Sequence, residues 1–184
     1  MGYRHTKDDI LDGAIAAAFD EGLSQLTFGR LAKRLGISDR VIVYYFPTKD
    51  DLITDVLLGL GSRLRAALAA TSSTPAGDHR ELVREAWPLL ARPEVDPVFA
   101  LFFEAAGLAV AGREPYREFV PSLVDGWITW AAERLSGPPA ARRVEAAAAI
   151  AAIDGLLILR QLAGPAVADR AAKQIVADRP SRHG

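Results

Sequence analysis

Apolar side chains recur at intervals of three and four residues along almost the whole chain, and this spacing limits the possible folds more than any other feature. Glycine or proline interrupts the pattern at short intervals. The single strand-like run, residues 41–46 (VIVYYF), lies between two helical patterns that are only a few residues away. The sequence therefore predicts an all-α protein of about nine helices.

Two short helices are expected within residues 27–46, joined by a turn at residues 35–38 (LGIS). Thr27 is a natural N-cap for the first helix, and Ser38 can cap the second. Gly36 supplies the positive φ that a tight turn between helices needs. This pattern is typical of a helix-turn-helix, whose second helix fits the major groove of DNA, although two surface helices with solvated charges would share it.

The other helices are expected on both sides of this segment. The first helix should stop at Gly22, and Thr48 should cap a long helix with an apolar residue every four positions. The predicted ranges are residues 7–21, 27–35, 38–46, 48–70, 79–91, 95–111, 116–135, 140–163 and 165–177.

The charge is distributed in favour of DNA binding at one place only. The whole chain has 22 basic and 23 acidic residues and a net charge of -1, so it is not a uniformly basic nucleic-acid binder. Between residues 30 and 40, however, there are four basic residues and only one acidic residue. They are Arg30, Lys33, Arg34 and Arg40, against Asp39. Arg4, His5 and Lys7 add a short basic arm at the N-terminus.

Several classes of function are disfavoured by what the sequence lacks. With no cysteine and three widely spaced histidines, neither a disulfide nor a metal site is expected. No catalytic triad, phosphate-binding glycine loop or paired histidine motif is present, so we expect neither an enzyme nor a cofactor. No uncharged apolar run approaches the ~18–20 residues of a membrane helix, and the N-terminus has no signal-peptide core. We expect a cytoplasmic protein without a membrane partner.

Residues 8–57 resemble the N-terminal domain of the TetR family of bacterial transcriptional repressors. The matching residues are Ile10, Leu11, Gly22, Thr27, Leu31, Ala32, residues 35–38 (LGIS), residues 45–49 (YFPTK) and Leu52. The resemblance implies a DNA-binding domain over residues 1–47, with the helix-turn-helix at about 27–46. It also implies a regulatory and dimerisation domain over residues 48–184, with a pocket for a small molecule.

The chain departs from the family pattern in two segments, so base preferences cannot be carried over from a typical member. The family often has glycine or proline followed by threonine where this chain has Arg40 and Val41, and usually tyrosine where it has Val43. Arg40 could read guanine or contact a phosphate, and Val41 could touch a thymine methyl or pack inward. Asp39 could accept a hydrogen bond from cytosine or cap the helix. Lys49 is expected to contact a phosphate. The candidate DNA-binding residues are Thr27, Arg30, Ser38, Asp39, Arg40, Val41, Tyr44, Tyr45 and Lys49.

The segment from residue 144 to residue 163 predicts self-association. Only four of its residues are polar, so a helix there needs apolar cover on nearly every side. A second subunit would supply part of that cover, although a central helix buried within a monomer would also explain the pattern. The candidate dimer residues are Ala148, Ala151, Ala152, Gly155, Leu159 and Leu162.

The middle helices carry the candidate effector site. Aromatic residues concentrate there, and two carboxylates, Glu104 and Asp154, have apolar neighbours on their own helix faces. Each carboxylate could bind a ligand, or could bond an internal arginine or a backbone group. The candidate pocket residues are Trp87, Phe99, Phe103, Glu104, Trp127 and Asp154, which imply a mainly apolar ligand with one donor or a positive charge.

These observations favour a dimeric, ligand-responsive transcriptional regulator, most often a repressor in this family. Its expected partners are a double-stranded DNA operator, a second copy of the chain and an unidentified small-molecule effector. The alternative is a helical protein–protein adaptor that keeps the fold without specific DNA binding. Specific, salt-dependent binding to a palindromic DNA would distinguish the two.

Overall fold

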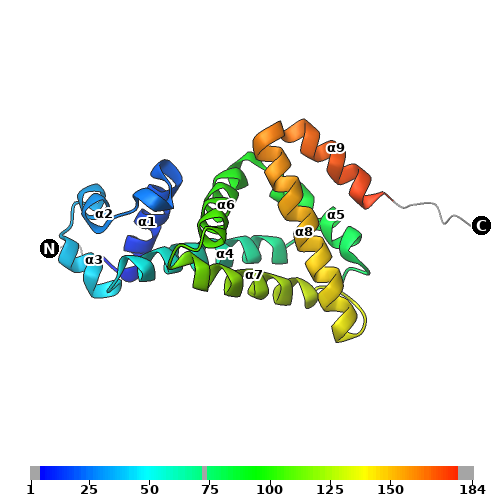
Figure 1. Cartoon of the computed structure of the whole chain (residues 1–184), viewed down its shortest axis with the longest axis horizontal. Coiled ribbons are helices and arrows are strands. Elements are labelled where there is room, and N and C mark those ends of the chain that lie inside the picture. Colours follow the sequence, from blue (N-terminus) through cyan, green and yellow to red (C-terminus); the bar gives the residue numbers. More distant parts are fainter. Residues whose placement is uncertain (1–4, 72–73, 178–184) are drawn as a thin grey trace, which may run out of the picture. The chain divides into compact units, whose positions relative to one another are not determined.

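The structure, a computed structural model, describes residues 5–71 and 74–177. Within those residues it contains nine α-helices, two short 3₁₀ helices and a single isolated β-bridge, with no β-strand (Figure 1). The all-α prediction is confirmed, and the bounds of the predicted helices agree with the structure to within a few residues.

The chain forms two compact units, and the first contains residues up to 66 together with residues 97–123. Its N-terminal bundle, as we name it, consists of α1, η1, α2 and α3. The rest of the unit comes from most of α4, most of α6 and the start of α7. The bounds are α1 Lys7–Glu21, η1 Leu23–Gln25, α2 Phe28–Leu35, α3 Asp39–Tyr45, α4 Lys49–Ala69, α6 Asp96–Val110 and α7 Tyr116–Ala132.

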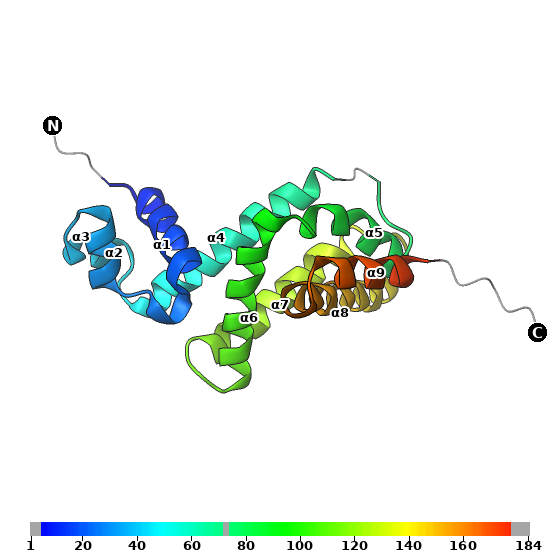
Figure 2. The same cartoon turned by 90° about the horizontal axis from the view of Figure 1, so that it is seen from above.

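The second unit contains residues 67–96 and those from 124 onward. Here α5 packs against both α8 and α9, and α8 and α9 pack against each other (Figure 2). A hydrogen bond from the indole N–H of Trp87 to Asp169, of 3.0 Å, joins α5 to α9. The bounds are α5 His79–Leu90, η2 Pro93–Val95, α8 Pro139–Ala163 and α9 Pro165–Val176.

The caps explain why the N-terminal helices begin and end where they do. The hydroxyl of Thr27 accepts a hydrogen bond from the Arg30 amide at 3.3 Å, as predicted for the start of α2. Thr48 and Asp51 form a reciprocal capping pair at the start of α4. One cap differs from the prediction. Ser38 occupies the N-cap position of α3, but its side chain makes no capping hydrogen bond.

Candidate nucleic-acid interface

The turn between α2 and α3 has the geometry of a helix-turn-helix. Gly36 ends α2 in the left-handed conformation with φ of 67°, and the Ile37 amide donates back to the carbonyl of Ala32 at 3.1 Å. Ile42 and Phe46 are fully buried, so they fix α3 against the rest of the N-terminal bundle. The opposite side of α3 is exposed in the part of the chain that the structure describes.

That exposed side of α3 carries several of the predicted DNA-binding residues. Ser38, Asp39 and Arg40 are exposed, and the side chain of Tyr44 is 78% exposed. No residue that the structure describes forms a hydrogen bond or ion pair with Arg40. Its five N–H donors are therefore available to an acceptor outside the chain.

Two neighbouring candidates are less accessible. Val41 is half-buried on the same helix. Tyr45 is half-buried as well, and its hydroxyl donates to the carbonyl of His5 at 3.3 Å. The Asp39 carboxylate lies near α2, because a Cβ added to Gly29 would stand 3.9 Å from its Oδ2 atom.

The basic cluster on α2 is partly neutralised by the end of α1. Arg34 forms an ion pair of 2.7 Å with Asp20. Arg30 pairs with Glu21 at 3.2 Å, although 56% of the Arg30 side chain remains exposed. Lys33 is exposed and has no such partner among the described residues. The sequence identifies the cations of this surface but not their acidic partners.

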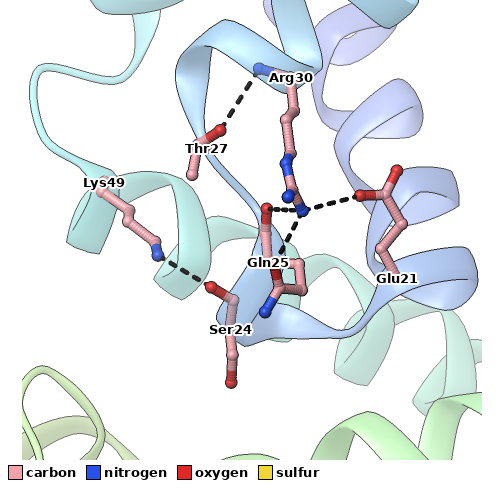
Figure 3. Close-up of polar contacts among 6 residues, drawn as sticks. All are labelled: Glu21, Ser24, Gln25, Thr27, Arg30 and Lys49. Atoms are coloured by element: carbon pink, nitrogen blue, oxygen red, sulfur yellow. Dashed lines mark hydrogen bonds and ion pairs between the residues drawn. The ribbon is translucent and has the colours of Figure 1, made fainter.

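The 3₁₀ helix η1 makes contacts with two cations among the predicted DNA-binding residues (Figure 3). Nη1 of Arg30 donates to the side-chain oxygen of Gln25 at 2.8 Å and to its carbonyl at 3.4 Å. Nζ of Lys49 donates to the carbonyl of Ser24 at 3.4 Å. Thr27, Arg30 and Lys49 therefore gather around η1, while Arg40 and Tyr44 extend from α3.

The predicted basic arm is described only in part. Arg4 lies outside the described residues. Lys7 forms an ion pair with Asp55 at 2.6 Å and lies 5.2 Å from the centre of the Phe46 ring. Its positive charge is thus used within the first unit, between α1 and α4.

The six candidate pocket residues are divided equally between the two units. In the first unit, Phe99 packs near Phe103, with ring centres 6.3 Å apart. The Glu104 carboxylate accepts the backbone amides of Leu23 and Ser24 at 2.9 Å each, which is one of the two roles that its sequence position leaves open.

In the second unit, Trp87 is buried and bonded to Asp169, and the Trp127 ring stands edge-on to Trp130 at 5.4 Å. Asp154 is half-buried and has no hydrogen bond or ion pair with any residue that the structure describes. Burial raises the pKa of the Asp154 carboxyl to about 6, because removal from water penalises its charged form.

The candidate dimer residues share one side of α8. Opposite them, Ala146, Ala149, Ile153, Leu156, Leu157 and Arg160 are buried. The other side leaves Leu159 39% exposed and Leu162 84% exposed, and a Cβ on Gly155 would meet no atom within 4 Å. Ala151 is exposed, while Ala148 and Ala152 are half-buried.

Among the described residues, α8 is the single helix long and apolar enough to cross a membrane by length and composition. Core helices of soluble proteins often pass the same test, so this result is weak evidence for a membrane span. Only 33% of its most apolar 18-residue window is buried. Part of the apolar surface of α8 therefore lies outside the core that the described residues form.

Comparison with known proteins agrees with this geometry. Residues 10–56 match the family model of bacterial regulatory proteins, tetR family. A transcriptional regulator from a Rhodococcus species has a similar structure, with a TM-score of 0.73, 21% identity, and 94% of each chain covered. The multidrug binding protein EbrR, solved with imidazole, aligns over 98% of this chain and 96% of its own, with a TM-score of 0.66 and 23% identity.

A third structure, a regulator from Saccharomonospora viridis in complex with choline, has a TM-score of 0.70 and 19% identity, with 92% of both chains covered. The comparison with curated proteins finds no match. The family model covers the helix-turn-helix together with most of α1 and the first turns of α4. The match to the tetR family model is confined to the N-terminal helices, and the likeness to these solved structures extends the shared fold over nearly the whole chain.

Sequence reasoning missed the residues that hold this surface in place. Asp20, Glu21 and Gln25 orient the arginines of α2, and Glu104 binds η1 from a position about eighty residues away. The adjacent acids at the end of the first predicted helix, opposite a basic helix, were a usable signal for Asp20 and Glu21. The contact made by Glu104 has no local signal.

Proposed function

We propose that the chain is a homodimeric transcriptional repressor that binds a palindromic operator and is released from it by a small, mainly apolar effector. One observation carries the proposal. The second helix of a helix-turn-helix exposes Ser38, Arg40 and Tyr44 on one side, and no described residue pairs with Arg40. An arginine there can donate two hydrogen bonds to guanine.

In this proposal residues 1–47 are the DNA-binding domain, and residues 48–184 form the regulatory and dimerisation domain. Thr27, Arg30 and Lys49 contact phosphates, while residues of α3 read base edges. A single helix in the major groove gives too little contact for tight, specific binding, so two copies reading two half-sites are required.

The exposed apolar side of α8 supports the homodimer. Gly155, Leu159 and Leu162 lie on this side, and a second copy of α8 would remove their apolar surface from water. The small residues Ala148, Ala151 and Ala152 let two helices approach closely. The interface in this proposal therefore consists of α8 with support from α9.

Asp154 supports an effector that carries a positive charge or a hydrogen-bond donor. A half-buried carboxylate without an internal partner is stabilised by a cation or donor that arrives with a ligand. Two similar structures were solved with choline and with imidazole. The remaining candidates, Trp87, Phe99, Phe103 and Trp127, would supply apolar surface. A protein that binds a DNA operator in a bacterium would act in the cytoplasm.

The direct test is selection of bound duplexes from a random DNA pool, followed by a binding titration at several salt concentrations. A repressor of this kind yields one palindromic sequence whose affinity falls steeply with salt. Positively charged aromatic and quaternary ammonium compounds are then screened for release of that duplex. Failure to enrich any sequence would favour the adaptor function instead.

A further inference from the structure

The carboxylate of Glu104, on α6, is bound to the backbone of η1. Oε2 accepts the Leu23 amide and Oε1 accepts the Ser24 amide, each at 2.9 Å. The hydroxyl of Ser24 donates to Oε1 as well. Three donors from one turn thus converge on a single carboxylate, and all of these residues belong to the first unit.

The local backbone explains why this contact is possible. Gly22, which precedes η1, has φ of 87°, and a Cβ there would stand 3.2 Å from Oε2 of Glu104. The first amides of a short helix have no partner within the helix, and no side chain of the N-terminal bundle caps η1. Glu104 supplies that cap from another part of the sequence.

The same turn touches both cations that the proposed function assigns to phosphates beside α2 and α4. The carbonyl of Ser24 accepts from Lys49, and Gln25 accepts from Arg30 through its side-chain and backbone oxygens (Figure 3). A shift of η1 would therefore move the acceptors that orient Lys49 and Arg30.

The charge of Glu104 acts on a buried tyrosine of the same unit. Tyr116 is buried in the same unit, and its pKa is raised to about 12 by burial, by the charge of Glu104 and by that of Asp50. The donors of η1 are the hydrogen-bonding groups that compensate the carboxylate.

We propose that Glu104 is a positioning residue for DNA binding, because it fixes η1 and thereby aligns Arg30 and Lys49 with the phosphate backbone. The part of this inference that concerns DNA binding rests on the proposed function. Its structural part, the cap on η1, is measurable without DNA. Both parts are tested with Glu104→Gln, which keeps the shape of the side chain but replaces one acceptor oxygen by an amino group.

The cap is measured first, by hydrogen exchange of the full chain without DNA. In Glu104→Gln one of the two amides loses its acceptor, so exchange at Leu23 or Ser24 should accelerate by about fivefold or more. Ser24→Ala removes only the hydroxyl donor and should show a smaller acceleration. Unchanged exchange at both amides in Glu104→Gln would overturn the proposal.

DNA binding is measured next, on the duplex selected by the wild-type protein. The matched control is Glu118→Gln, which removes the same charge from an exposed residue of the first unit. Removing a negative charge strengthens binding to a polyanion in general. We expect the opposite for Glu104→Gln, a loss of affinity of about fivefold, while Glu118→Gln stays equal to the wild type or gains slightly.

The salt dependence separates positioning from general stability. If Arg30 and Lys49 lose their alignment, the slope of log affinity against log salt should fall by about 1 to 2, since each phosphate contact contributes about 0.9. An unchanged slope and an affinity change equal to that of Glu118→Gln would overturn the positioning role. If the wild-type protein selects no DNA, the proposed function fails, and hydrogen exchange still decides whether Glu104 caps η1.

Discussion

The guanidinium of Arg160, on α8, forms two parallel hydrogen bonds with the carboxylate of Asp96 at the start of α6. Nε lies 2.6 Å from Oδ1, and Nη2 lies 3.1 Å from Oδ2. Arg160 is only 6% exposed, which makes it the single buried charged residue in the described part of the chain. The Asp96 carboxylate raises the pKa of Arg160, so the arginine stays charged and depends on this partner.

The first prediction concerns this ion pair. Asp96→Asn leaves the buried positive charge of Arg160 without its counter-charge, and it should lower the free energy of unfolding by about 3 kcal/mol. Urea denaturation measures the effect. The double variant Asp96→Asn, Arg160→Met removes both charges and should recover much of the loss. A double variant that is no more stable than Asp96→Asn alone would contradict this account.

The second prediction concerns base recognition by α3. Arg40→Ala should weaken binding to the selected operator by about 1–3 kcal/mol and relax the preference at one position of each half-site. Fluorescence anisotropy on the operator and its single-base variants measures both effects. Lys49→Ala is the control, since the loss of a phosphate contact weakens binding to all sequences equally. If Arg40→Ala also weakened all sequences equally, Arg40 would be a phosphate contact, and no effect would exclude α3 from the groove.

The third prediction concerns assembly. Gly155→Glu or Leu159→Glu places a charge on the exposed apolar side of α8, and each should convert the dimer into a monomer and abolish operator binding. Light scattering coupled to size-exclusion chromatography gives the mass at micromolar concentration. Ser122→Glu, at an exposed position on α7, should leave the dimer intact. A monomeric wild-type protein under these conditions would disprove the interface.

The fourth prediction concerns pH. Burial raises the pKa of Asp154 to about 6 from a value of 3.8, so between these pH values the folded chain holds a proton that the unfolded chain has lost. The free energy of unfolding should therefore decrease as pH rises from about 4 to 6, by up to about 3 kcal/mol, and stay at the lower value above that range.

Asp154→Asn should remove this dependence and stabilise the protein at pH 7. Denaturation at pH 4.5 and at pH 7 measures it, with Glu133→Gln as an exposed control in the same unit. Equal pH profiles for Asp154→Asn and the wild type would show that Asp154 does not titrate in this way. Asp154→Asn should also lower the affinity of the protein for any cationic effector that the screen identifies.

Local signals made the helix-turn-helix predictable. Gly36 and Thr27 interact with groups only three or four residues away in the sequence. Gly36 adopts the left-handed conformation, and Thr27 caps α2, as their positions predict. The all-α fold follows from the spacing of apolar residues in the same way. Ser38 shows the limit of this reasoning, because its residue type suits a cap that its side chain does not make.

Long-range partners were not predictable by the same means. Glu104 has apolar neighbours on its own helix, which indicates a partly buried carboxylate, but its acceptor role depends on a turn about eighty residues away. The partner of Arg160 likewise lies 64 residues away in sequence. Such contacts depend on how helices pack, and a single sequence carries no record of that packing.

The ion pairs of Arg30 and Arg34 with the end of α1 determine how much binding free energy each cation of this surface can contribute in a redesigned protein. An arginine that already holds a carboxylate exchanges one anion for another when a phosphate arrives, so its net gain is smaller than that of Lys33 or Arg40. In the proposed complex with DNA, Asp20 and Glu21 would therefore limit nonspecific binding to nucleic acid. Replacing these two acids with neutral residues should increase the affinity for DNA and lower the sequence selectivity, while every residue of α3 stays unchanged.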